Sequence, residues 1–274
     1  MFSTAHMIFI GISFALMAAG IRVVRWKKPS LKRLAAVCFP AALLSEAVKV
    51  LSIIEILPVV EPVIENGALV YRETGAYAPY LEAEHLPLEL CSLQMLFMLL
   101  FLVSRVRERE RKLLALIYGT AIPGGLAAIF LSSIAPQFET AAEFFTAPRA
   151  WQFFLYHSMI VVLGAAIGLD REYRLHFRDV RYALMGLLGL DAIMFYLNSV
   201  FSIPYYQDGR VAGIGYAVNF FSSYANPLGI VMTDKAQYLL YLLIRLLVGT
   251  LLILLVFTPF AWRDRMEKRQ RSSP

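Results

Sequence analysis

The sequence predicts an all-α polytopic membrane protein with seven transmembrane helices, an outside N-terminus and a cytoplasmic C-terminus. Two observations lead to this prediction. First, 59% of the 274 residues are hydrophobic and 17% are charged, with a mean hydropathy of +0.62, whereas soluble domains have roughly 45–50% apolar and about 25% charged residues. Second, the Lys and Arg residues gather in short clusters beside apolar runs, a pattern typical of a cytoplasmic membrane face.

Seven apolar runs approach the length of a spanning helix, which is about 20 residues. The first run has no basic segment before it and leads directly into Arg-Trp-Lys-Lys, which favours an uncleaved anchor over a cleaved signal peptide. We expect residues 1–274 to form one seven-helix membrane domain, with a basic cytoplasmic tail over residues 261–274. The predicted spans are approximately residues 5–24, 34–56, 86–103, 113–134, 150–169, 182–203 and 238–260.

The basic residues set the orientation. Of the 26 Lys and Arg residues, 20 follow the first, third, fifth and seventh runs. The alternate loops hold only Arg72, Arg149, Arg210 and Lys235. Positive charge is concentrated in cytoplasmic loops, so only an odd number of crossings fits, in a multi-pass protein of the cell membrane.

Two of the predicted outer loops are long. Residues 55–85 are acidic, and residues 205–237 are rich in Gly, Tyr, Asn and Ser. Loops of this length are usually lids or disordered segments. Their tyrosines and phenylalanines suit the membrane–water interface.

Several functional classes lack their usual signals. The net charge of +6 does not indicate a nucleic-acid partner, because the basic clusters lie beside apolar runs. Neither a glycine-rich phosphate loop nor zinc-type cysteine spacing is present, so no cofactor or metal is predicted. The two cysteines, Cys38 and Cys91, are expected near opposite membrane faces, too far apart for a disulfide.

Polar residues within the runs mark the candidate site. At about 1.5 Å per helical residue, five of them fall in one layer roughly 7–11 Å below the outer boundary. These five are Lys49, Cys91, His157, Asn198 and Arg245. Glu46 and Asp191 lie somewhat deeper, and Gln94 neighbours Cys91 on the third run. In an ideal helix, Glu89 points to nearly the opposite side from Cys91.

This layer has a structural and a chemical interpretation. Lys49 and Arg245 form ion pairs with Glu46 and Asp191 in the simplest reading, because unpaired charge within a membrane is costly. A single membrane cysteine such as Cys91 is more often a small packing residue than a nucleophile. The chemical reading is a dyad in which a histidine takes the proton of a nearby thiol and leaves a nucleophilic thiolate.

The segment LPLELCSLQ resembles the LPL-x-L-C signature of the YwaF-type integral membrane proteins, a bacterial family. The resemblance covers most of the chain and includes Phe-Leu-Tyr-His157, Asn198 late in the sixth run, and the final YLLYLLIRLLVGTLLILLVFTPF. Bacterial members often carry His where this chain has Glu89. The family is similar to an animal transmembrane protein regarded as an acyltransferase of ether phospholipids, whose Cys and His catalytic pair matches Cys91 and His157.

The resemblance implies phospholipid acyl transfer in an outward-facing polar cavity, with membrane lipids as partners. Cys91 attacks an ester carbonyl in this hypothesis, and His157 is the general base. Gln94 or Asn198 donates to the oxyanion, while Lys49 and Arg245 hold a lipid phosphate. The alternative is a non-enzymatic transporter or small-molecule sensor that uses the same cavity and needs the charges but not the thiol.

Overall fold

The computed structural model describes residues 3–65, 68–132, 134, 137–207, 210–215, 218–222 and 234–272. Most of these residues are helical. The α-helices are α1 (Thr4–Lys27), α2 (Leu31–Ile53), α3 (Leu93–Val103), α4 (Arg107–Phe130), α5 (Ala141–Thr146), α6 (Pro148–Leu169), α7 (Val180–Val200) and α8 (Lys235–Ser272). Short 3-10 helices are η1 (Ala83–His85), η3 (Phe177–Asp179) and η4 (Phe220–Ser222). The strands are β1 (Glu55–Glu65), β2 (Ala68–Tyr80), β3 (Ile203–Gln207) and β4 (Arg210–Gly215).

Within the described residues, six helices are long and apolar enough to cross a membrane, namely α1, α2, α4, α6, α7 and α8. The shorter apolar helix α3 accompanies them. This confirms the predicted all-α polytopic membrane fold. The third run departs from its predicted bounds, because the helix expected over residues 86–103 begins only at Leu93. The division of the chain into one domain and a basic tail stays a prediction, and α8 continues without a break through residue 261.

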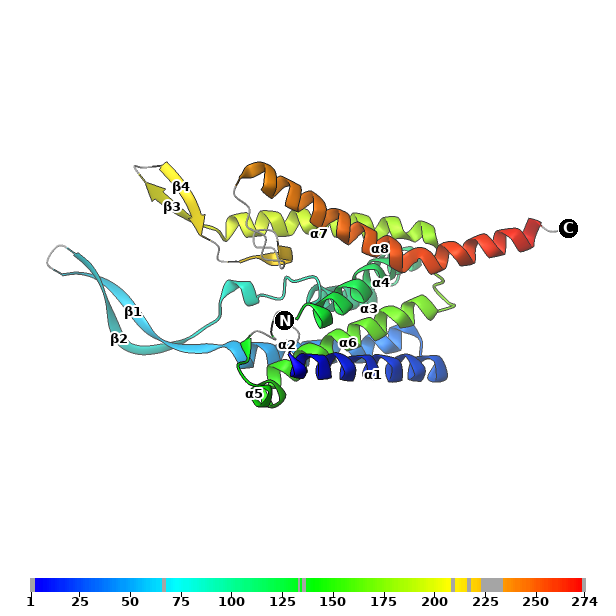
Figure 1. Ribbon diagram of the computed structural model, residues 1–274, viewed down its shortest axis with the longest axis horizontal. Helices are drawn as coiled ribbons and strands as arrows, with labels where there is room; N and C mark the ends of the chain where they lie inside the picture. The colour runs from blue at the N-terminus through cyan, green and yellow to red at the C-terminus, as the bar shows by residue number, and fades with distance from the viewer. Residues whose placement is uncertain are drawn as a thin grey trace.

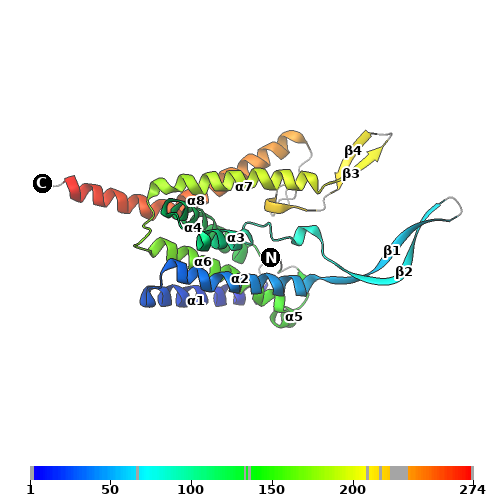
Figure 2. The ribbon, with the colours of Figure 1, turned by 180° about the vertical axis from the view of Figure 1, so that it is seen from behind.

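The helices lie roughly side by side, and both hairpins project from one end of the bundle (Figure 1). The N-terminal end of α1 lies toward the hairpins, and the C-terminal part of α8 extends past the opposite end (Figures 1 and 2). The chain therefore begins and ends at opposite ends of the bundle. The side of the membrane that each end faces stays a prediction.

The two long loops contain antiparallel hairpins, which the sequence analysis did not predict. In the first, Glu55 pairs with Tyr80 and Glu65 pairs with Ala68. Its strands are rich in valine, isoleucine and tyrosine, which favour extended backbone, and almost every residue in them is exposed. The second hairpin pairs Ile203 with Gly215. Residues 208–209, 216–217 and 223–233 of the second loop lie outside the described residues.

Close packing around α4 organises the core. This helix contacts α3, α6, α7 and α8, and small residues allow the close approach. A Cβ atom on Gly119 would lie 2.6 Å from Cβ of Ala183 on α7. A Cβ atom on Gly164 of α6 would lie 2.6 Å from Cγ1 of Ile122. Small residues at helix crossings are the usual way in which membrane helices gain packing contacts.

A polar network joins the helices at the end away from the hairpins. Lys32 Nζ lies 2.8 Å from Glu110 and donates to the carbonyl of Ser104 beyond α3. The Tyr173 hydroxyl donates to Glu110 at 2.8 Å. Burial and the adjacent Glu110 raise the pKa of Tyr173 to about 12, so its phenol remains a donor near neutral pH. The Glu110 carboxylate thereby connects the start of α2 to the α6–α7 loop, and Lys32 extends the network to the end of α3.

Candidate functional site

The predicted nucleophile lies in an irregular segment, residues 86–92, rather than in a helix. Pro87 lacks a backbone N–H and so disfavours a regular helix here. Two contacts from neighbouring helices hold the segment and the residue that precedes it. The Tyr156 hydroxyl of α6 donates to the Cys91 carbonyl at 2.6 Å, and Lys49 Nζ of α2 donates to the His85 carbonyl at 3.0 Å.

This segment forms one wall of a polar cavity of about 470 Å³ near the hairpin end of the bundle. The other walls come from the C-terminal end of α2, α4, the N-terminal half of α6 and the segment around η4. The titratable side chains that line it are Glu46, Lys49, Glu84, His85, Glu89, Cys91, Arg149, Tyr156 and His157. The cavity thus gathers a thiol, a phenol, two imidazoles, two cations and three carboxylates.

Cys91 and His157 both line this cavity. His157 is buried, and its Nδ1 atom lies 2.7 Å from the carbonyl of Phe153. A carbonyl only accepts hydrogen bonds, so Nδ1 carries the proton in a neutral ring and Nε2 is the basic nitrogen. The thiol of Cys91 and an imidazole whose basic nitrogen is Nε2 therefore share one cavity.

Glu89 lines the same cavity as Cys91. An ideal helix would place these two side chains on nearly opposite sides, but residues 86–92 are not helical. The irregular backbone therefore brings the carboxylate and the thiol to one wall.

Two cations lie in the cavity. Lys49 is buried and pairs with Glu46 one turn earlier on α2. Arg149 donates to the side chain of Gln152 on α6. The apolar runs place Arg149 in an outer loop and do not predict it as a site residue. Pro148 occupies the first turn of α6, and proline at this position is a recognised start signal that places Arg149 inside the helix.

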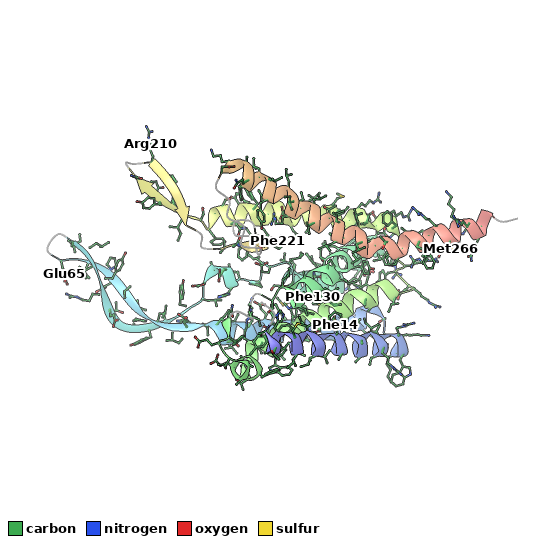
Figure 3. The ribbon with its side chains drawn as sticks, in the orientation of Figure 1. Phe14, Glu65, Phe130, Arg210, Phe221 and Met266 are labelled. Carbon is green, nitrogen blue, oxygen red and sulfur yellow. The ribbon has the colours of Figure 1, made fainter. Side chains whose placement is uncertain are left out.

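Arg245 and Asp191 belong to a neighbouring cavity of about 250 Å³. Arg245 Nη2 lies 2.5 Å from Asp191 Oδ1, and Nη1 donates to the carbonyl of Phe221. Figure 3 shows Phe221 in the segment beside α7 and α8. Glu89 and Ser222 line both cavities. The predicted single layer of polar residues is therefore divided into two adjoining sites.

Gln94 and Asn198 are both buried, and neither is among the residues that line the large cavity. The Gln94 amide donates to Thr120 Oγ1 at 2.9 Å and to the Leu90 carbonyl at 3.2 Å. The Asn198 side chain exchanges two 2.9 Å hydrogen bonds with the backbone of Phe220. These contacts fix α3 to α4 and α7 to η4.

Metal-binding potential is limited within the described part of the chain. There, only Glu82, Glu84 and His85 bring their ligand atoms within 4.8 Å of one another. Both carboxylates are exposed and His85 is half-buried. We assign no metal to this group. Cys38 and Cys91 are both free thiols, as the sequence analysis expected.

Comparison with known proteins identifies the family. No curated protein and no solved structure matches the chain significantly. One family model, described as the TMEM164 family, matches residues 1–258. The match extends from the start of the chain into α8 and includes both cavities. This multi-pass membrane protein therefore belongs to the TMEM164 family.

Proposed function

We propose that this protein transfers acyl groups between membrane lipids, with Cys91 as the nucleophile and His157 as the general base. The observation that supports this proposal best is the shared cavity. Cys91 and His157 come from segments 66 residues apart in the sequence, yet both line one polar cavity with Lys49 and Arg149. In this proposal the protein resides in the cell membrane. The end of the helix bundle that carries the hairpins faces outward.

The first half-reaction forms a thioester. His157 Nε2 accepts the thiol proton, and the Cys91 thiolate attacks the ester carbonyl of a phospholipid. A carbon–sulfur bond forms, the ester carbon–oxygen bond breaks, and the departing lysolipid oxygen takes the proton from His157. The enzyme then carries the acyl group on Cys91 Sγ.

The second half-reaction transfers this acyl group. His157 Nε2 accepts the proton of an incoming lysolipid hydroxyl, whose oxygen attacks the thioester carbonyl. The new carbon–oxygen bond forms, the carbon–sulfur bond breaks, and the sulfur recovers the proton from His157. No oxidant or metal enters either step, and the ester bond lost in the first step is regained in the second.

Electrostatics assign roles to the surrounding groups in this proposal. Lys49 and Arg149 attract the lipid phosphate, since both cations line the cavity. Ser92 follows Cys91 and lines the same cavity, so its hydroxyl is assigned as a donor to the developing oxyanion. Gln94 and Asn198 support the cavity walls instead, because their amides are hydrogen-bonded elsewhere. Arg245 acts from the adjoining cavity.

Thioester formation tests the proposal. The purified protein in detergent is treated with an activated acyl ester, and the product is analysed by intact mass and peptide mapping. We expect a hydroxylamine-sensitive acyl group on Cys91. Cys38→Ser is the matched control, because Cys38 is the other cysteine and is buried in α2. Acylation at residues other than Cys91, or acylation that is undiminished in Cys91→Ser, would contradict acyl transfer through Cys91. Such a result would favour transport or small-molecule sensing.

A further inference from the structure

An apolar groove runs between α2 and α6, separate from the polar cavity. Its volume is about 400 Å³, within the range of about 300–1,000 Å³ that is usual for ligand pockets. Its lining residues on α2 are Ala41, Leu44, Ser45 and Val48, and those on α6 are Pro148, Trp151, Gln152, Leu155, Tyr156 and Met159. Both helices are long and apolar enough to span the membrane, so the surroundings of this groove are hydrocarbon.

The groove meets the polar cavity at two residues. Gln152 and Tyr156 line both spaces. Tyr156 is also the residue whose hydroxyl holds the Cys91 carbonyl. A molecule in the groove therefore reaches the wall of the cavity at the side chain that positions the thiol-bearing segment.

Polar contacts cross the junction between the two spaces. Gln152 Nε2 donates to Ser45 Oγ of α2 at 2.7 Å, and Arg149 donates to the Gln152 side chain. The only cationic group in this chain of contacts is Arg149, which lines the polar cavity and not the groove. The junction thus joins an apolar groove to a positively charged group. A phospholipid has a matching order, because its apolar acyl chain is followed by the ester and then by the negatively charged phosphate.

We propose that the α2–α6 groove holds one acyl chain of a membrane phospholipid, which enters sideways from the bilayer with its phosphate at Arg149. Hydrocarbon is the occupant because the groove is lined mainly by apolar side chains within the membrane, and the phosphate follows from charge complementarity. The chemical consequence, delivery of the ester to Cys91, rests on the proposed function. Occupation of the groove by a lipid chain does not depend on the proposed function.

Photocrosslinking tests the groove directly. The full-length protein is placed in lipid nanodiscs with a phosphatidylglycerol whose acyl chain carries a diazirine at its middle, irradiated, and mapped by peptide mass spectrometry. We expect crosslinks to concentrate in residues 41–48 and 151–159. Val48→Trp fills the groove and should remove most of these crosslinks. Leu51→Trp is the matched control, since Leu51 lies on the same helix, is 76% exposed and does not line the groove.

A second variant and a second probe complete the test. Leu155→Trp blocks the facing wall from α6 and should repeat the Val48→Trp result if that variant fails to fold. A diacylglycerol with the same diazirine chain lacks the phosphate and should crosslink less than phosphatidylglycerol. Arg149→Gln should abolish that difference. Equal labelling by the two probes would overturn the role of Arg149.

The outcomes separate the groove from the enzyme reaction. Crosslinks spread evenly over the lipid-facing helices, or unchanged in both tryptophan variants, would overturn the groove proposal even if Cys91 forms a thioester. Concentrated crosslinks that are lost in the tryptophan variants support the groove even if Cys91 never becomes acylated. In that second case the proposed function alone fails, and the groove is a lipid-binding site without transfer chemistry.

Discussion

The hydroxyl of Tyr156 donates a 2.6 Å hydrogen bond to the carbonyl of Cys91, and the next residue on α6 is His157. One helical segment therefore holds the backbone of the proposed nucleophile and carries the proposed base. This relationship makes Tyr156 a positioning residue whose role is separable from the chemistry of the thiol itself.

Tyr156→Phe should slow acylation of Cys91 while leaving the fold intact. A hydrogen bond contributes about 0.5–1.5 kcal/mol net, which corresponds to a rate loss of at most about tenfold. The rate is measured with the activated acyl ester, and the melting temperature is measured in parallel. A variant with an unchanged acylation rate would show that the tether does not position the thiol.

Cys91→Ser should abolish transfer, because serine forms no comparable anion near neutral pH. His157→Ala should reduce transfer by about 10²–10⁴-fold, the usual contribution of a general base. The double variant should be no worse than Cys91→Ser alone, since residues that act as a unit are not additive. Acyl exchange between radiolabelled phospholipid and lysolipid provides the measurement. Full activity in His157→Ala would exclude the proposed base.

Glu46→Gln should destabilise the protein more than the double variant Glu46→Gln/Lys49→Gln. The single change leaves Lys49, whose side chain is 10% exposed, without its carboxylate. Removing one partner of a buried pair typically costs about 3–5 kcal/mol, and the partial exposure here places the expected loss below that range. Thermal unfolding in detergent compares the two variants with the native protein. A single variant that is as stable as the double variant would argue against this ion pair as a structural contact.

Gly125→Ala should weaken both stability and transfer, because α4 and α6 touch at this position. An added Cβ would lie 2.6 Å from Cγ2 of Val161 and 3.1 Å from the carbonyl of His157. Overpacking of this kind costs about 1–3 kcal/mol, and the displaced backbone is that of the proposed base. Gly189→Ala is the control, since nothing lies within 4 Å of its Cβ position. Equal melting temperatures and activities in the two variants would contradict the prediction.

The sequence predicts the helices well because spanning length is a local property. It places the third helix too early, since the contacts that hold residues 85–92 come from Tyr156 and Lys49, far away in the chain. Helical phase calculated for that segment consequently separates Glu89 from Cys91, whereas both line one cavity. Arg149 was missed for a different reason. Assigning Lys and Arg residues to the loops between apolar runs leaves out Pro148, which signals the start of a helix.

Depth along a helix groups polar residues by level but does not determine which of them meet. Equal depth allows two helices to face apart. Arg245 and Lys49 were predicted in one layer, and they line two adjoining cavities. Asn198 shares the same expected depth, yet it binds the backbone of Phe220. Helix rotation is set by packing such as that at Gly125, which hydropathy does not encode.

The last prediction concerns orientation. The hairpin β1–β2 carries a single basic residue, Arg72, whereas the C-terminal part of α8 is rich in arginine and lysine, and the two lie at opposite ends of the bundle (Figure 1). Because basic residues collect on the cytoplasmic side, a reporter fused after Lys268 should be cytoplasmic. A reporter inserted in the first hairpin, between residues 61 and 80, should be outside. Paired alkaline phosphatase and fluorescent protein fusions measure both positions, since the enzyme folds outside and the fluorophore matures inside. An outside signal from the C-terminal fusion would reverse the orientation, and the polar cavity near the hairpins would then open toward the cytoplasm.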